Sequence, residues 1–365
     1  MQLKEIYVKD FRNYEEQRLV FHEKINLLTG SNGQGKTNLL EAIYTLSMGK
    51  SFRTSRETEM IRFEADFLRV EGSFRKEGRK LVIEVMLSKN EKRFKIDGFQ
   101  GTKNADLLEN AYMVSFSPED LRIVKDDPEK RRRFIDRELF QIRPLYYKDL
   151  SKYKKSLLQR NALLKRENPG EDMLAVWDAH LTQHGTRIMK ERGLFIEKLS
   201  RVSGRIHAGI TGEKETLSLR YESNIEKKGE PDFSREAFAA KLAETREKDL
   251  YRGYTDAGPH RDDLCILVNG TDVRHFGSQG QQRTAALSLK LAELQIIKEE
   301  TGEEAIILLD DVFSELDGER QQFLIRSLSE NQIFLSAAEI SGEILERLPR
   351  GDVFHVKEGR AAKKE

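Results

Sequence analysis

The sequence predicts an α/β protein in which a mixed lobe of strands and helices is interrupted by a helical region. Three observations lead to this prediction. Apolar residues alternate with polar ones in several short segments of the first hundred residues, which is typical of strands. Residues 129–198 are dense in Leu, Lys, Arg, Glu and Gln with few turn signals, which favours long helices. Strand patterns then return at Asp263–Val268 and Ala305–Leu309.

The individual elements follow from these patterns in chain order. Strands are expected at Gln2–Val8, Arg18–Phe21, Ile25–Thr29, Phe67–Phe74, Lys80–Leu87 and Arg93–Ile96, with a helix at Asn38–Leu46. An exposed loop is expected at 225–232, a helix at Arg235–Arg252, and a frayed charged tail at Gly359–Glu365. We therefore predict an N-terminal part of the mixed lobe at 1–115, a helical lobe at 116–252, and the C-terminal part of the mixed lobe at 253–365.

Composition excludes several classes of protein. The 365 residues suit about two domains, and 63 Lys+Arg against 62 Asp+Glu leave a net charge of +1, so any nucleic-acid surface must be local. A membrane-spanning helix needs about 20 apolar residues, far more than the short apolar runs of this chain, so no membrane span is expected. The single cysteine, Cys265, cannot form an internal disulfide. A cytoplasmic protein is the natural expectation.

A phosphate-binding motif follows the third expected strand. Gly30-Ser31-Asn32-Gly33-Gln34-Gly35-Lys36-Thr37 fits G-x-x-x-x-G-K-[ST] and precedes a predicted helix. Glycines let backbone N–H groups point at phosphate oxygens, and the helix adds its positive N-terminal dipole. Lys36 would bind the β and γ phosphates of ATP, and Thr37 would bind Mg²⁺. The alternative, a glycine-rich turn with an accidental Lys-Thr, explains less of the pattern.

The second half of the site lies far downstream. Ala305–Leu309 has the continuous apolar pattern of a strand buried on both faces, and it ends in Asp310 and Asp311. This is a Walker B pattern, in which Asp310 would hold Mg²⁺ and Asp311 would orient or deprotonate the attacking water as the catalytic residue. A plain helix cap near Val312 explains one carboxylate better than two.

Two further segments resemble parts of ABC ATPases. Ser314-Glu315-Leu316-Asp317 resembles the D-loop, in which Asp317 would meet a partner protomer. Ser278-Gln279-Gly280-Gln281 precedes an apolar helix and resembles the ABC signature. Ser278 can cap the helix while Gly280 and Gln281 approach a phosphate, so the helix start becomes a second anion site. An ordinary N-cap is the alternative, and the P-loop and Walker B weigh against it.

With these motifs in place, the chain resembles the SMC-like ABC ATPases and, within them, the RecF family of bacterial recombination mediators. The resemblance covers essentially the full length. Beyond the ATPase motifs it rests on four segments, namely Asp10-Phe11-Arg12-Asn13-Tyr14, Phe116–Leu121, Arg131–Asp136 and Gly258–Asp263. It implies an ABC-type P-loop ATPase head with an inserted helical lobe, and the chain has no room for a long coiled coil.

The resemblance also implies roles for particular residues. Arg12 and Asn13 are expected to reach the nucleotide, and the Q-loop role falls to Gln100 or Glu119, between which the sequence does not decide. Ser336 stands at the switch position, where many ABC proteins carry histidine, and Asp311 replaces a glutamate. These departures imply slow hydrolysis, so we expect a weak DNA-linked ATPase that acts as a timing switch.

A DNA surface is expected on the helical lobe. Lys148–Arg166 holds seven basic residues against one acidic residue, Asp149, and Arg131, Arg132 and Arg133 add to it. Such a surface binds phosphates without sequence preference and with strong salt dependence. The resemblance implies an ATP-dependent homodimer on single-stranded or gapped DNA, the partners RecR and RecO, and a task in RecA loading, replication and SOS induction.

Two rival functions and one metal site stay open at this point. A P-loop kinase or metabolic ATPase acting on a small molecule explains Lys36 and Asp310 but gives the signature segment no task. A transporter's ATP-binding subunit does not account for the basic helical insert. His260, Asp262 and Asp263 are metal-ligating types, but their spacing matches no recognised ligand set, so a hydrogen-bonded strand entry is favoured.

Overall fold

The computed structural model describes residues 1–54, 56–101, 104–166, 170–227, 229–338 and 348–364. The chain divides into two compact units, which we call unit 1 and unit 2. Unit 1 comprises Met1–Leu121 and Glu293–Glu365, and unit 2 comprises Arg122–Ala292. The helical region is thus an insertion into a split α/β lobe, in agreement with the predicted fold class.

The second predicted boundary is displaced. We expected the mixed lobe to resume at residue 253, whereas the structure assigns residues up to Ala292 to unit 2. The reason is strand pairing, because β12 (Asp263–Val268) runs antiparallel to β9 (Leu217–Glu222) and so belongs to the sheet of the insert. A strand pattern in the sequence does not say which sheet the strand joins.

Unit 1 contains two six-stranded sheets. The first is antiparallel, in the order β2-β1-β4-β5-β6-β7. Its strands are β1 (Gln2–Phe11), β2 (Tyr14–Val20), β4 (Phe67–Lys76), β5 (Arg79–Ser88), β6 (Lys92–Ile96) and β7 (Phe99–Gln100). The strands β4 and β5 bury alternate residues, as a sheet with one packed face should.

The second sheet of unit 1 has a parallel centre and the order β17-β16-β3-β15-β14-β8. Its strands are β3 (Ile25–Thr29), β8 (Met113–Phe116), β14 (Ile306–Asp310), β15 (Ile333–Ala337), β16 (Gly351–Lys357) and β17 (Arg360–Lys363). The carboxyl ends of its parallel strands share one edge, where ligands bind in open α/β sheets. The motifs that follow β3 and β14 are therefore brought to the same edge.

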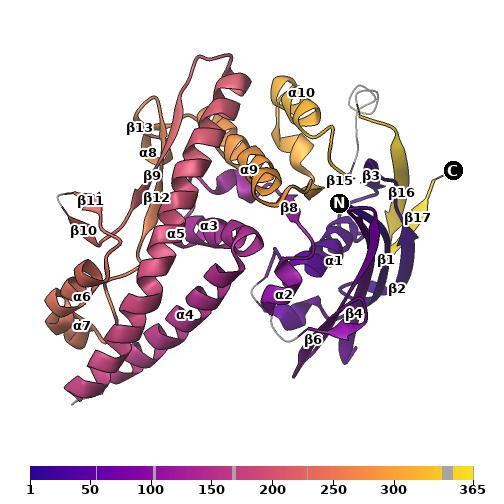
Figure 1. Ribbon diagram of the computed structural model, residues 1–365. Coiled ribbons are helices and arrows are strands. Elements are labelled where there is room, and N and C mark those ends of the chain that lie inside the picture. Colours follow the sequence, from indigo (N-terminus) through magenta and orange to yellow (C-terminus); the bar gives the residue numbers. More distant parts are fainter. Residues whose placement is uncertain (55, 102–103, 167–169, 228, 339–347, 365) are drawn as a thin grey trace. The chain divides into compact units, whose positions relative to one another are not determined.

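Helix α1 (Lys36–Met48) lies between the two sheets (Figure 1). It packs against β1, β4 and β5 of one sheet and against β8, β14 and β15 of the other. Its apolar residues are spread around the helix, as expected for a helix covered on both sides. Unit 1 also contains α2 (Asn104–Leu108), α10 (Gly318–Ser327) and the short 3-10 turns η1 (Glu57–Met60) and η3 (Val312–Glu315), with η2 (Asp120–Arg122) at the boundary.

The predicted frayed tail is wrong. Residues Arg360–Lys363 form β17, which pairs antiparallel with β16 through a turn at Glu358 and Gly359. Both turn residues have positive φ angles, 48° and 72°, a conformation that a tight hairpin requires. The charged composition of the tail hid an edge strand, where charged side chains are common because they discourage pairing with other chains.

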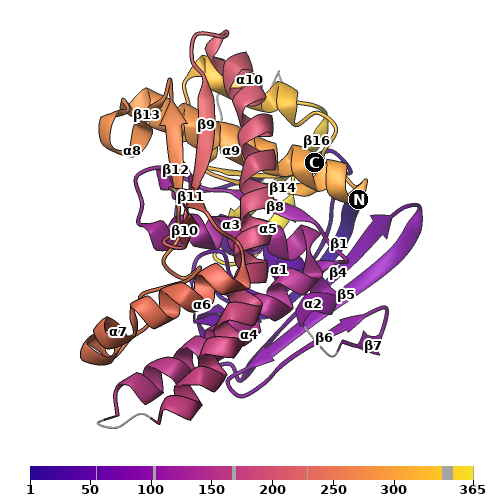
Figure 2. The same ribbon diagram turned by 60° about the vertical axis from the view of Figure 1, so that its left-hand side comes forward.

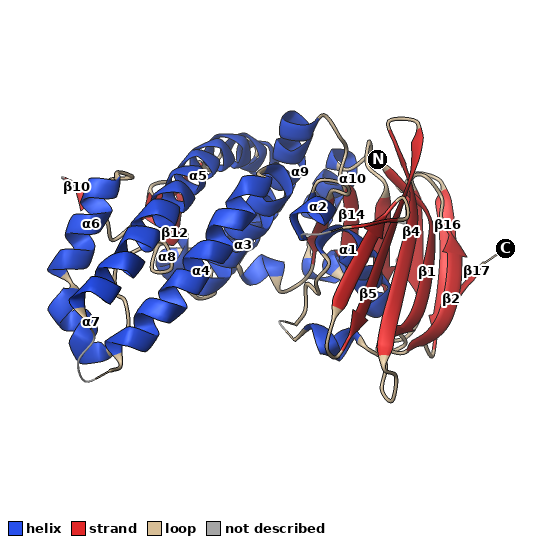
Figure 3. Cartoon of the chain, turned by 60° about the horizontal axis from the view of Figure 1, so that its bottom comes forward, coloured by secondary structure: helices blue, strands red, loops and turns tan. Residues whose placement is uncertain are grey.

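Unit 2 is built on an antiparallel pair of long helices, α4 and α5 (Figures 2 and 3). The predicted helical region consists of α3 (Pro128–Ile142), α4 (Pro144–Leu164) and α5 (Glu171–Thr211). Helices α3 and α4 each begin at a proline, which the first helical position tolerates because its N–H has no helical partner. No sustained coiled coil is present in the part of the chain that the structure describes.

The rest of unit 2 consists of short elements that pack on these helices. They are β9, β10 (Glu226–Lys227), β11 (Glu230–Pro231), α6 (Arg235–Glu244), α7 (Arg246–Arg252), β12, β13 (Thr271–Asp272) and α8 (Val273–Phe276). Helix α9 (Gln279–Thr301) begins in unit 2 and ends in unit 1. The loop expected at 225–232 is a small hairpin, and the helix expected at Arg235–Arg252 is divided at Thr245. Among the described residues, no helix has the length and apolar character that crossing a membrane requires.

Candidate nucleotide site and signature segment

The phosphate loop connects β3 to α1 and curls around the side chain of Lys36. Gly30, Gly33 and Gly35 have φ angles of 141°, 81° and 120°, which disfavour any residue with a side chain. The Lys36 ammonium donates hydrogen bonds to the carbonyl oxygens of Gly30 at 2.5 Å and Ser31 at 3.0 Å. Burial lowers the pKa of Lys36, while the nearby carboxylates of Asp311 and Asp310 oppose that shift. Lys36, the residue predicted to bind phosphate, is therefore held inside its own loop.

The phosphate loop and the Walker B segment are in direct contact. Thr37 Oγ1 donates a hydrogen bond of 2.8 Å to Asp310 Oδ1, although the two residues are 273 positions apart. Ser336 Oγ donates to the same oxygen at 2.6 Å, because β15 lies directly beside β14. A hydroxyl and a carboxylate in contact are oxygen ligands of the type that Mg²⁺ prefers. The two residues expected to hold the metal are thus adjacent.

Asp311 occupies a constrained position one residue further on. Its φ angle is 53°, and its N–H donates to the carbonyl oxygen and to Oγ of Ser336. Burial raises the pKa of the Asp311 carboxyl, and the adjacent Asp310 raises it further. A raised pKa suits a carboxylate that accepts a proton from water. Ser336, expected at the switch position, contacts both aspartates.

The turn between β16 and β17 braces the phosphate loop. Gly359 N donates to Gln34 O at 3.0 Å, and Glu358 N donates to Gln34 Oε1 at 2.8 Å. A Cβ on Gly359 would lie 2.0 Å from the carbonyl oxygen of Asn13, and a Cβ on Gly30 would lie 2.3 Å from that of Val356. The C-terminal hairpin therefore sets the shape of the loop, which the sequence did not reveal.

Asn13 lies against the phosphate loop as well. Its side-chain amide donates to Gln34 O at 3.0 Å and accepts from Asn38 Nδ2 at 2.8 Å. A Cβ on Gly35 would lie within 3 Å of the Asn13 amide. Asn13 therefore lies beside the phosphate loop, and its contact with a nucleotide stays a prediction.

Arg12 is held by a residue that sequence reasoning missed. Its guanidinium makes two hydrogen bonds to the fully buried carboxylate of Glu41, at 2.9 and 2.7 Å. Arg53 lies 3.5 Å from the same carboxylate, and Ser51 also donates to it. Glu41 is one of the polar residues of a largely apolar helix, and a buried acid needs such a partner. An acidic residue within this apolar helix was the sequence feature that could have predicted a buried partner such as Arg12.

The two Q-loop candidates are associated with different sheets. Gln100 is an exposed residue of β7 and belongs to the antiparallel sheet. Glu119 follows the carboxyl end of β8, which is the parallel neighbour of β14. The sheet topology therefore favours Glu119, because the nucleotide motifs sit at that edge.

The signature segment, Ser278–Gln281, is held by hydrogen bonds between its own residues. Ser278 Oγ accepts a hydrogen bond from Gln281 N at 3.2 Å, and Gln281 Oε1 accepts one from Ser278 N at 2.9 Å. This reciprocal pair is a capping box at the start of α9. Gln281 Nε2 donates to Glu215 at 2.9 Å, while Ser278 stays exposed and Gly280 lies in the first turn. The capping role is thus present, and it also fixes the helix start.

Asp317 forms a cap in unit 1. Its Oδ1 accepts from Arg320 N at 3.0 Å at the start of α10, and its Oδ2 pairs with the Arg320 guanidinium. The Asp317 side chain is 54% exposed, so a partner can reach it. The helix cap accounts for its local role.

The segment around His260 is a hydrogen-bonded core. His260 Nδ1 lies 2.7 Å from the Tyr153 hydroxyl, and Nε2 lies 2.9 Å from Thr255 O. Asp262 accepts from the Tyr221 hydroxyl, and Asp263 accepts two bonds of 2.7 Å from Arg131. Among the described residues, no cluster of three or more His, Cys, Asp or Glu is arranged to hold a metal.

Some of the predicted basic surface is buried. Arg160 is fully buried and pairs with Asp178 at 2.6 Å and Asp249 at 2.7 Å. Arg131 is also buried, whereas Arg133 is exposed and pairs with Glu129. The other basic residues of the stretch are exposed, namely Lys148, Lys152, Lys154, Lys155, Lys165 and Arg166. A basic stretch in the sequence does not show which side chains the helix turns inward.

The comparison with known proteins assigns the family. The model for the RecF/RecN/SMC N terminal domain matches residues 2–339. A DNA replication and repair protein RecF from Clostridioides difficile is 44% identical over 361 residues, which cover 98% of this chain and 97% of that protein. This chain belongs to the RecF family. A second RecF protein, from Lysinibacillus sphaericus, is 42% identical over the full length of both chains.

Solved structures extend the relationship. The recombination mediator protein RecF of the RecFOR pathway, solved with ATP, superimposes with a TM-score of 0.92 at 39% identity and covers all of this chain and 98% of its own. An Smc head bound to the C-winged helix domain of ScpA shares the fold, with a TM-score of 0.55 at 15% identity. The predicted RecF-type ATPase head is confirmed. RecF membership favours DNA repair over the small-molecule kinase.

Proposed function

We propose that this chain is an ATP-dependent DNA-binding protein of recombinational repair. Two copies would bind head to tail around ATP on single-stranded or gapped DNA, and slow hydrolysis would release them. The observation that carries the proposal is the contact of Thr37 with Asp310 at the edge of the parallel sheet, in a chain of the RecF family. That contact joins the two halves of a nucleotide site.

ATP is assigned to the loop Gly30–Thr37, with the Lys36 ammonium on the β and γ phosphates. The residues that would hold Mg²⁺ are Thr37 and Asp310, and the metal would neutralise phosphate charge. Asp311 would orient the attacking water through its carboxylate. Arg12 and Asn13 would contact the nucleotide from the β1–β2 turn, with Glu41 fixing the direction of the Arg12 guanidinium.

Slow turnover follows from two residues of this site. Asp311 has a shorter side chain than the glutamate that many ABC enzymes carry, so it reaches less far toward a water. Ser336 supplies a hydroxyl at the switch position and already donates to Asp310. A hydroxyl does not take up a proton near neutral pH, unlike the imidazole of histidine. We therefore infer a timing switch rather than a motor.

The signature segment would close the site of the partner protomer. The start of α9 offers Ser278, Gly280 and Gln281 to the γ phosphate of the second copy, and Asp317 would contact that copy at the D-loop. The remaining roles follow from family membership, namely RecR and RecO as partners, RecA loading, replication and SOS induction in the cytoplasm.

Sedimentation velocity with a labelled gapped duplex, at two salt concentrations, tests this proposal. With ATP and Mg²⁺ we expect a salt-sensitive DNA complex of dimer size, and with ADP we expect it to be largely lost. Chelation of Mg²⁺ should have the same effect as ADP. A monomer that ignores DNA in all conditions would contradict the proposal.

Variants separate nucleotide binding from dimerisation. Lys36→Met should abolish ATP binding, whereas Ser278→Arg should leave ATP binding intact and block the ATP-driven dimer. Ser234→Arg is the matched control, because Ser234 is the N-cap of α6 and accepts from Ala237 N in the same way. If Ser278→Arg still dimerises with ATP, the signature assignment is wrong.

A further inference from the structure

An exposed aromatic ring lies at the end of α7, next in sequence to Arg252. The Tyr251 side chain is 92% exposed, the highest value among the large hydrophobic residues of the described chain. Lys248 lies three residues before it on α7, so the two side chains share one face of the helix, and Arg252 follows it directly. Lys248, Arg252 and Arg261 are exposed too. We call this group the α7 platform; it consists of Lys248, Tyr251, Arg252, Tyr254, Asp256 and Arg261.

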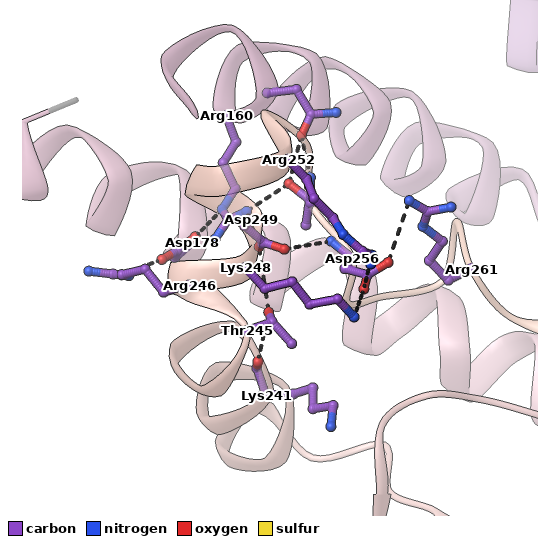
Figure 4. Close-up of polar contacts among 12 residues, drawn as sticks. Arg160, Asp178, Lys241, Thr245, Arg246, Lys248, Asp249, Arg252, Asp256 and Arg261 are labelled. Carbon is purple, nitrogen blue, oxygen red and sulfur yellow. Dashed lines mark hydrogen bonds and ion pairs between the residues drawn. The ribbon is translucent and has the colours of Figure 1, made fainter. Parts of the chain in front are cut away.

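Three cations of the platform converge on one carboxylate, that of Asp256 (Figure 4). Its oxygens lie 2.5 Å from Lys248 Nζ, 3.3 Å from Arg252 Nη1 and 3.6 Å from Arg261 Nη2. The hydrogen bond from Lys248 and the charges of all three cations lower the pKa of the Asp256 carboxyl. One anion cannot balance three cations, so the platform keeps a positive surplus that suits a further anion.

The aromatic ring of Tyr254 orients two of these cations. The guanidinium carbon of Arg261 lies 5.0 Å from the ring centroid, and that of Arg252 lies 6.0 Å from it. Cation–π contacts of this kind hold the planar groups in fixed directions. Lys165, the C-cap residue that follows α4, passes close to Gly253 and adds a further cation beside the platform.

The platform rests on buried polar groups. Arg160 and Asp249 are fully buried and pair at 2.7 Å, and Arg160 Nη1 also donates to Thr255 Oγ1 at 2.8 Å. Asp249 Oδ1 accepts from Asp256 N at 3.0 Å, and Asn161 Oδ1 accepts from Thr255 N at 2.8 Å. These bonds fix the loop that carries Tyr254 and Asp256. Such fixed geometry reduces the entropy that binding costs.

We propose that the α7 platform binds single-stranded DNA, with Lys248, Arg252 and Arg261 on the phosphates and Tyr251 stacked on an unpaired base. The proposal rests on the DNA-binding function proposed above and names the surface and the form of DNA. Bases in a duplex already stack on one another, so an exposed ring can stack only on a base that is unpaired. Backbone contact and stacking imply no sequence preference.

Asp256→Asn is a test in which the substitution is expected to strengthen DNA binding. Removing the carboxylate charge frees three cations for phosphates, so affinity for oligo-dT should rise by roughly twofold to fivefold, and the salt dependence should steepen. The backbone N–H of residue 256 still donates to Asp249 in this variant. A merely structural role for Asp256 predicts unchanged or weaker binding.

Tyr251→Ala tests the stacking. The exposed ring contributes little to folding, and its loss should weaken oligo-dT binding by about 5- to 100-fold while leaving duplex binding nearly unchanged. Tyr251→Phe should retain binding, because the ring face remains. Phe99→Ala is the matched control, since Phe99 is an exposed ring, 80% accessible, on β7 of unit 1. Fluorescence anisotropy of the full chain with labelled oligo-dT and a duplex, with ATP and Mg²⁺, measures all of these.

The outcomes distinguish this inference from the function on which it rests. If both variants bind oligo-dT as the wild type does, the platform assignment is overturned while DNA binding stands. Equal losses on oligo-dT and duplex would overturn the assignment to single strands. If the wild type binds neither DNA, the proposed function fails together with the platform.

Discussion

The phosphate loop of unit 1 and the signature segment of unit 2 are both glycine-containing helix starts, but they are built differently. The signature segment holds itself through bonds between Ser278 and Gln281, three positions apart. The phosphate loop is held by residues from both ends of the chain, with Asn13 on one side and Gly359 on the other. A motif whose contacts are local can therefore be predicted from the sequence. The distant residues that support a loop cannot.

The largest effect on stability and ATP affinity is expected where the C-terminal hairpin supports the phosphate loop. In Gly359→Ala, the new Cβ would lie 2.0 Å from the Asn13 carbonyl oxygen in a backbone with φ 72°. We expect a loss of about 3 kcal/mol or more in the free energy of unfolding, and ATP affinity reduced at least about tenfold because the loop must shift. Denaturant unfolding and nucleotide titration measure the two effects.

Gly78→Ala is the control for this change. Gly78 has φ 78° in the turn between β4 and β5, and nothing lies within 4 Å of its added Cβ. The variant should lose only the left-handed penalty, about 1 kcal/mol, and should bind ATP normally. Equal behaviour of the two variants would mean that the hairpin does not brace the loop.

A pH-dependent change of similar size in the free energy of unfolding is expected in unit 2. It should not alter the phosphate loop. Burial lowers the pKa of His260 to about 4 and raises the pKa of Asp262 to about 6. Neutral His260 therefore contributes stability that is lost as pH falls from about 6.5 to 4, while protonated Asp262 contributes stability that is gained as pH falls from about 6 to 4. The two contributions oppose each other.

Asp262→Asn removes the contribution of Asp262 to the pH dependence and leaves that of His260. Between pH 6 and pH 4 the variant should lose about 2–3 kcal/mol of unfolding free energy relative to the wild type. Urea unfolding across this range measures the difference. Parallel curves for the two proteins would show that Asp262 does not titrate as a buried acid.

The smallest effect is expected at the signature segment. Gln281→Ala removes half of the capping box and the bond to Glu215, so the free energy of unfolding should fall by about 1 kcal/mol. ATP affinity of the monomer should not change, because the segment is built without the phosphate loop. A clear loss of monomer ATP affinity would contradict the local character of this helix start.

Much of the site could be predicted because its chemistry depends on short spacings. The phosphate loop, the strand ending in Asp310 and Asp311, and the serine before α9 each lie within a few consecutive residues. The tail and the basic stretch were predicted less well. Charged residues at Arg360–Lys363 hid an edge strand, and Arg160 was counted as surface although Asp178 and Asp249 bury it.

The sequence by itself determined the family, the ATPase motifs and the helical insertion, because residue type and spacing suffice for these. Only the tertiary structure decided that β12 joins β9, that the last hairpin supports the phosphate loop, and that Glu41 holds Arg12. The reason is that pairing and burial depend on residues far apart in the chain. Local preferences fix which element forms, but they do not fix which partner it meets.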